Sequence, residues 1–185
     1  EKIRTDCLVL ATGHSARDIY EVTAGLELPM SAKPFSVGVR IEHRQEDIDS
    51  SLYKGYAGHP LLGAAEYTFS LRKGNRGVYN FCMCPGGEVI AAASEVGGVV
   101  TNGMSKSARA GINGHAALCV SVLSEDFGAD LFGGVKFQRQ LEQAAYAVSG
   151  SYRAPAQMVG DYLSGMKTTS FGRVKPTYSA GVVPC

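Results

Sequence analysis

Apolar and polar positions recur along this chain with two periods, one typical of strands and one typical of helices. Strict alternation from Phe35 to Ile41 places every second side chain on one apolar face and predicts a half-buried strand. Helical spacing from Gly134 to Val148 predicts an amphipathic helix that Gly150 ends, and a second helix is expected from Pro155 to Leu163. Shorter alternating runs between glycine-bearing turns predict a β-meander and one more strand, with candidate strands at 66–72, 77–83, 88–94, 97–102 and 115–123.

The first apolar run, residues 6–12, predicts a buried strand that continues through a turn into a helix at about 16–24. Ser15 is a suitable N-cap, and Asp18 completes the pattern of a capping box. The segment 42–65 is charged and then rich in Gly and Pro, which predicts a helical turn and a loop. The patterns together predict an α+β fold, in which an antiparallel or mixed β-sheet has helices packed on one face.

Composition narrows the class of protein without naming it. The 185 residues are 45% hydrophobic, which suits one domain or one domain plus part of another, and disorder is excluded. Lys and Arg number 18 against 17 Asp and Glu, so neither nucleic acid nor a membrane surface is an expected partner. The five cysteines show no spacing typical of a secreted disulfide framework, which favours a reducing cytoplasm.

Two segments are candidates for ligand contact through their backbone. The turn made by Ala11, Thr12 and Gly13 would let backbone approach a planar ligand, although a strand–turn–helix also needs glycine for its turn alone. Consecutive alanines after Gly86 and Gly87 leave a low surface on which a ring system or a helix could lie. Asn102 follows, where it suits either a tight turn or a polar contact with a ligand.

Cys82 and Cys84 are the remaining candidates. Alternate residues of a regular strand have Cα atoms about 6.5–7 Å apart, which is at or beyond the limit for a disulfide. A zinc site would need further Cys or His ligands at suitable spacing, and the sequence has no second pair, so no metal is expected. Structural or pocket-lining thiols are favoured, while a redox role and adventitious metal binding stay open. The four histidines are scattered, and no catalytic acid–base pattern is visible.

Five sequence motifs, in their order along the chain, together resemble a known protein family, whereas no single motif is specific enough to do so. They are Leu10–Asp18, Pro34–His43, Phe81–Gly87, Val100–Ser105 and Arg153–Gln157. The set resembles a family of largely uncharacterised bacterial FAD-dependent dehydrogenases, flavoproteins of the two-dinucleotide-binding-domain type. The resemblance extends over essentially the whole chain.

This resemblance implies a division of the chain. Residues 1–26 would be a strand and helix left from a Rossmann-type FAD-binding domain, and 27–185 an inserted domain that covers the flavin and shapes the substrate pocket. Ala11, Thr12 and Gly13 match a family motif that contacts FAD. The family's glycine-rich pyrophosphate loop and its closing C-terminal segment are both absent here, so the missing parts of the FAD-binding domain are the implied partner. FAD is expected in the full-length parent and not in this chain alone.

The leading hypothesis is therefore the substrate-side domain of an FAD-dependent oxidoreductase, inactive by itself, with an unidentified small-molecule substrate. A second hypothesis is a ligand- or partner-binding α+β domain without enzymatic activity. A third is a thiol-redox module that uses Cys82 and Cys84.

Overall fold

The computed structural model describes residues 2–185, which form two compact units. The first ends at Ser31 and the second comprises Ala32–Cys185. Each unit is described by itself below.

The first unit contains one regular element, helix α1 (Arg17–Gly25). The predicted strand at 6–12 is wrong for this structure, because the segment is irregular and Leu8 and Val9 are each 81% exposed. A strand must pair its backbone N–H and C=O groups with a neighbour, and none of the residues described here pairs with this segment. The predicted Ser15 cap is also wrong, since Ala16 is the N-cap and no side chain caps the helix. The strand–helix remnant is thus not formed, and α1 alone is regular.

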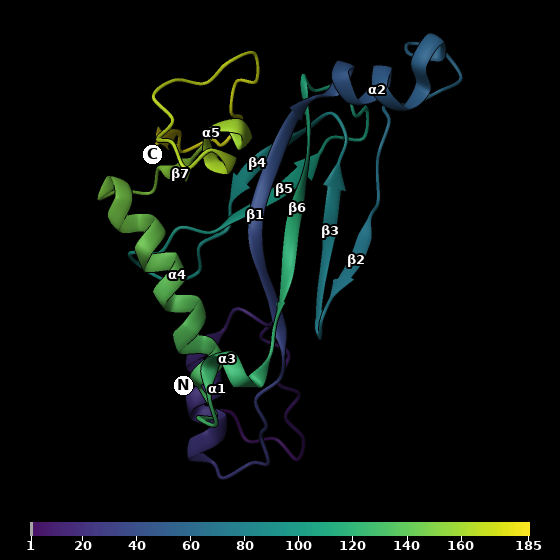
Figure 1. Ribbon diagram of the computed structural model, residues 1–185. Coiled ribbons are helices and arrows are strands. Elements are labelled where there is room, and N and C mark those ends of the chain that lie inside the picture. Colours follow the sequence, from purple (N-terminus) through teal and green to yellow (C-terminus); the bar gives the residue numbers. More distant parts are fainter. Residues whose placement is uncertain (1) are drawn as a thin grey trace. The chain divides into compact units, whose positions relative to one another are not determined.

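The second unit is built on an antiparallel sheet of four strands in the order β1-β6-β3-β2 (Figure 1). These strands are β1 (Phe35–Arg44), β2 (Ser70–Lys73), β3 (Arg76–Cys84) and β6 (Asn113–Val122). Helix α2 (Gln45–Tyr53) and the short 3-10 helix η1 (Lys54–Tyr56) follow β1 at one end of the sheet. The α+β prediction is confirmed, as are the strands expected near 35–41, 77–83 and 115–123.

The expected continuous meander is wrong beyond β3. Strands β4 (Gly87–Ala91) and β5 (Thr101–Ser105) form a separate antiparallel hairpin, and β3 pairs instead with the distant β6. The hairpin packs across the sheet near β3 and β6. Local alternation identified the strands, but pairing partners depend on which apolar faces meet in the folded chain.

Opposed residues of antiparallel strands point to the same side, so the register defines two unlike sheet faces. One face is apolar and includes Val37, Val120 and Val78 in one row and Val39 with Leu118 in the next. Part of it is uncovered, with Val39 64% exposed, whereas Val37, Val78, Leu118 and Val120 are partly buried. The other face carries polar side chains of β1, among them Arg40 and Glu42. The β4–β5 hairpin lies over part of this second face.

Helices and short strands follow β6. Helix α3 (Ser124–Phe127) leads into α4 (Gly133–Ser149), which confirms the predicted helix, and α4 extends from the end of the sheet where β1 begins toward β7 (Figure 1). The main buried cluster joins α4, the β4–β5 hairpin and the C-terminal segment, and consists of Val89, Val99, Ala154 and Tyr178. Within the described residues, no helix is long and apolar enough to span a bilayer.

The predicted helix 155–163 is shorter than expected. Pro155 lies in a strand, β7 (Ala154–Ala156), which pairs in parallel with β8 (Val182–Pro184). Helix α5 (Val159–Leu163) begins only afterwards. Pairing with the extended tail competes with the helical preference of residues 155–158, a long-range effect that local spacing does not reveal.

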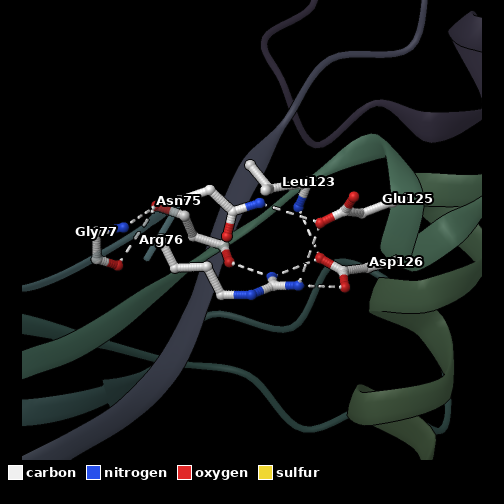
Figure 2. Close-up of polar contacts among 7 residues, drawn as sticks. Asn75, Arg76, Gly77, Leu123, Glu125 and Asp126 are labelled. Atoms are coloured by element: carbon white, nitrogen blue, oxygen red, sulfur yellow. Dashed lines mark hydrogen bonds and ion pairs between the residues drawn. The ribbon is translucent and has the colours of Figure 1, made fainter. Parts of the chain in front are cut away.

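A charged contact fixes the β2–β3 turn against α3 (Figure 2). The guanidinium of Arg76 donates two hydrogen bonds to the carboxylate of Asp126, at 2.6 and 2.7 Å, and a third to the carbonyl of Ser121 at 2.9 Å. The two bonds from Arg76 to this carboxylate, together with one from the Leu123 N–H, lower the pKa of Asp126 to about 2. The carboxylate therefore stays ionised across the physiological range and holds the hairpin on α3.

Candidate functional site

Five side chains from four strands meet where the β4–β5 hairpin crosses the polar face of the sheet. They form what we call the Arg40 cluster: Arg40 of β1, Cys82 and Cys84 of β3, Asn102 of β5 and His115 of β6. The register explains their meeting, because Glu42 and Cys84 both lie opposite His115, and Arg40 is two residues from Glu42 on the same face. Strand pairing therefore places residues that are far apart along the chain on one surface of the sheet.

Arg40 is the centre of this cluster and is partly exposed. Its Nη1 atom donates to the Nδ1 atom of His115 at 3.0 Å and to the carbonyl of Cys82 at 3.3 Å, and Nη2 reaches Asn102 Oδ1 at 3.5 Å. All three acceptors are neutral. No carboxylate in residues 2–185 forms an ion pair with this guanidinium. The positive charge is thus held in place without being neutralised.

The nearby acid, Glu42, is engaged elsewhere. Its carboxylate accepts hydrogen bonds from the hydroxyl of Thr177 at 2.6 Å and from the amide of Asn113 at 3.1 Å. The Thr177 hydroxyl in turn accepts from the Val89 N–H at 2.8 Å. Glu42 therefore anchors the C-terminal segment to the two sheets rather than pairing with Arg40.

His115 is fully buried beneath the hairpin. Burial lowers its pKa most, Arg40 lowers it further, and Glu42 and the Glu88 backbone raise it in part. The imidazole is neutral, and its Nδ1 accepts from Arg40, which places the ring proton on Nε2. In the part of the chain described, Nε2 makes no hydrogen bond of normal geometry. His115 acts here as a buried support for Arg40.

Glycines let the two sheets approach closely around the cluster. A Cβ atom on Gly103 would overlap the His115 ring and the Arg40 guanidinium. Gly87 is similarly confined, since its Cβ would lie 2.7 Å from the Met104 carbonyl oxygen and 2.9 Å from Cys84 Cβ. Gly86 has φ +53° and packs against the backbone of Arg109. These glycines are needed for close backbone packing.

The structure thus brings together several of the residues expected from the sequence. Cys82, Cys84 and Asn102 line the Arg40 cluster, and Gly86 and Gly87 form the turn beside it. Sequence reasoning missed Arg40 and treated His115 as isolated. The polar positions of β1, alternating with its apolar face, were the signal that could have identified Arg40.

The turn Ala11–Gly13 lies in the other compact unit and is exposed. Gly13 has φ +83° and no atom within 4 Å of a Cβ placed on it, so the turn has room for a ligand beside its backbone. Among residues 2–185, however, the strand expected before it is not formed, and no glycine-rich loop lies between a strand and a helix to hold a pyrophosphate. The described residues therefore do not form a complete FAD site, and contact of FAD with Ala11, Thr12 and Gly13 stays a prediction.

Two other kinds of site, a metal centre and a pocket between helices, are not supported by the described residues. No group of three or more Cys, His, Asp or Glu side chains among residues 2–185 is arranged to hold a metal ion. A shallow depression between α3 and α4 is lined by Asp126, Asp130, Lys136 and Phe137, and its charges are already paired with one another or with Arg76. The Arg40 cluster is therefore the strongest candidate site.

Taken together, the fold and the site define an α+β domain with an unneutralised arginine and a thiol pair at the junction of two antiparallel sheets. The family model of the FAD-dependent protein C-terminal domain-like group matches residues 34–185. The chain belongs to this family and contains a domain of an FAD-dependent protein. The expectation of an FAD-dependent family is confirmed at this level.

A relative from Clostridium beijerinckii (strain ATCC 51743 / NCIMB 8052), named only as an uncharacterized protein, is 48% identical over 185 residues. The match covers 98% of this chain and 35% of the relative. The chain therefore spans about a third of the length of the curated relative it matches.

Proposed function

We propose that this chain is the substrate-side domain of an FAD-dependent oxidoreductase, in which the flavin performs the electron transfer and this domain binds and orients the substrate. Arg40 carries the proposal. A partly exposed guanidinium held by three neutral acceptors attracts an anionic group, and its planar fork suits a carboxylate or phosphate. Ala117 and Phe81 continue the row of Arg40 across the sheet, and Phe81 is 63% exposed. An anionic substrate with a flat apolar part fits this surface.

The exposed part of the apolar sheet face supports the same proposal. Val39 is 64%, Leu71 55% and Phe69 42% exposed, and Val39 and Leu71 point to this face. Exposed apolar patches of this kind mark surfaces that pack against something else. We propose that the remaining part of the longer FAD-dependent protein covers this face. A partner-binding domain without enzymatic activity would also use it. The Arg40→Met experiment below separates the two, because only the substrate-side proposal expects an anionic probe to bind at Arg40.

The first prediction concerns this chain alone. We expect no saturable FAD binding, because the described residues supply no pyrophosphate cradle. The measurement is a titration of FAD into the folded chain, followed by flavin fluorescence and absorbance, with folding checked first by circular dichroism. The natural protein is the positive control. Stoichiometric, tight binding of FAD by this chain would contradict the proposal.

The second prediction concerns Arg40 in the natural protein. Arg40→Met should weaken binding of benzoate, a planar carboxylate probe, by about 10- to 100-fold, since a hydrogen bond to a charged group contributes about 1.5–3 kcal/mol. FAD content should stay unchanged. Calorimetry of benzoate binding and the flavin-to-protein absorbance ratio give the two readouts. Arg72→Met is the matched control, because Arg72 is an exposed arginine of β2 away from the cluster.

Two outcomes of this experiment would count against the proposal. Equal benzoate affinity in Arg40→Met and Arg72→Met would remove Arg40 from substrate binding. Loss of FAD from Arg40→Met would assign Arg40 to the flavin instead of the substrate. Arg40→Lys should retain part of the affinity, because it keeps the charge and loses the bidentate geometry.

A further inference from the structure

Cys82 and Cys84 lie at an irregularity of strand β3. The pairing of β3 with β6 shifts register between Phe81 and Cys84, and Cys82 has φ +50°. A left-handed conformation at a residue other than glycine costs roughly 1–2 kcal/mol and is often found at functional positions. The bulge departs from the regular strand spacing on which the argument against a disulfide rested, and the two Sγ atoms are 3.9 Å apart. A disulfide has an S–S distance of about 2.05 Å, so the two sulfur atoms must approach further to bond.

The two thiols differ in exposure. Cys82 is exposed, whereas Cys84 is 7% exposed. Burial raises the pKa of Cys84, and the neighbouring Cys82 raises it further, while Arg40 lowers it in part. An exposed thiol that meets an external reagent, next to a buried thiol that only its neighbour can reach, is the arrangement of an attacking and a resolving cysteine.

Arg40 helps to hold this arrangement. It donates to the carbonyl of Cys82 at 3.3 Å, and the Cys84 thiol donates to the same carbonyl at 3.4 Å. The bulged conformation therefore has hydrogen bonds that favour it from both sides.

We propose that Cys82 and Cys84 form a reversible dithiol–disulfide pair that exchanges with low-molecular-weight disulfides. The Cys82 thiolate attacks one sulfur of the external disulfide, forming a mixed disulfide and releasing one thiol. The Cys84 thiolate then attacks Cys82 Sγ, which forms the Cys82–Cys84 bond and releases the second thiol. The cysteine pair loses two electrons and two protons, and the external disulfide is reduced to two thiols. This proposal does not depend on the substrate-side function.

The experiment equilibrates the natural protein with mixtures of oxidised and reduced glutathione. Acid quenching, alkylation and peptide mass spectrometry then report the state of each cysteine. We expect the peptide that contains both Cys82 and Cys84 to lose two hydrogens and to escape alkylation as the buffer becomes more oxidising. Cys7, an exposed cysteine without a described thiol neighbour, is the internal control and should form only mixed disulfides.

Two variants test the assigned roles. Cys84→Ser should trap glutathione on Cys82, because the resolving thiol is gone. Cys82→Ser should leave Cys84 as a free thiol, since it is buried. The proposal is overturned if the pair remains reduced in buffers that modify Cys7, or if wild type and Cys84→Ser carry equal amounts of glutathione on Cys82. The wild-type measurement stands even if a variant fails to fold.

Discussion

Gly86→Ala is expected to destabilise the domain by about 2–4 kcal/mol, one of the two largest effects we expect from a single substitution near the site. Gly86 has φ +53°, where a Cβ adds about 1 kcal/mol of strain. The added Cβ would also overlap the carbonyl group of Arg109 and lie 2.9 Å from the Gly111 nitrogen. Those neighbours are backbone atoms, so relief requires movement of the main chain. Urea denaturation followed by circular dichroism measures the loss.

Gly74→Ala is the matched control for this prediction. Gly74 has φ +63° in the β2–β3 turn, and no atom lies within 4 Å of a Cβ placed there. It therefore carries the conformational strain of Gly86 without the overlap, and we expect a loss of about 1 kcal/mol. Equal losses in the two variants would show that the close approach to Arg109 contributes nothing.

Gln45→Leu should destabilise the domain by about 3 kcal/mol, because it leaves buried backbone groups without partners. The Gln45 side chain is buried at the start of α2 and bonds to three groups. It accepts from the Gly86 N–H at 2.8 Å and donates to the Ala65 carbonyl at 2.9 Å and to Asp49 Oδ1 at 2.8 Å. Leucine has a similar volume and supplies none of these bonds, so the loss reports the polar contacts. Denaturant unfolding of the two proteins measures it.

The control for Gln45 is Gln143→Leu, the same chemical change at an exposed position of α4. We expect its effect to stay within about 0.5 kcal/mol, as for most surface substitutions. Gln45→Glu adds a second test, because it keeps the shape and places a carboxylate beside Asp49. Its loss should be greatest at neutral pH and shrink on acidification, as the introduced carboxyl becomes protonated. A loss below about 1 kcal/mol for Gln45→Leu would contradict the assigned role.

Gln45 and Gly86 matter for the site because they fix the turn that follows the thiol pair. Gly86 accepts from the Gly111 N–H at 3.1 Å as well as donating to Gln45, so both of its peptide groups are held. Cys84 lies two residues before it, at the edge of the Arg40 cluster. Because this turn follows Cys84 directly, it supports the part of the Arg40 cluster that contains the thiol pair.

Local sequence patterns predicted most elements of the second unit. The alternation in β1, the run that became β6 and the spacing in α4 were correct because each depends on the solvent and core faces of one continuous segment. The five motifs resembled an FAD-dependent family, and the family model that matches residues 34–185 confirms that family. The sequence also indicated five residues at or beside the candidate site, namely Cys82, Cys84, Gly86, Gly87 and Asn102. It did not predict that they lie close together in the folded chain.

The tertiary structure alone decided how those segments meet. Arg40 and His115 are separated by 75 positions, and their contact follows from the pairing of β1 with β6. The bulge at Cys82, which brings two sulfurs together against the expectation for a regular strand, arises from the register of β3 on β6. The apolar run at 6–12 has the composition of a strand and no partner among the described residues. Hydrophobic periodicity shows which side chains of a segment face the core. A strand also needs backbone hydrogen-bonding partners from another segment, and those partners are brought beside it only when the chain folds.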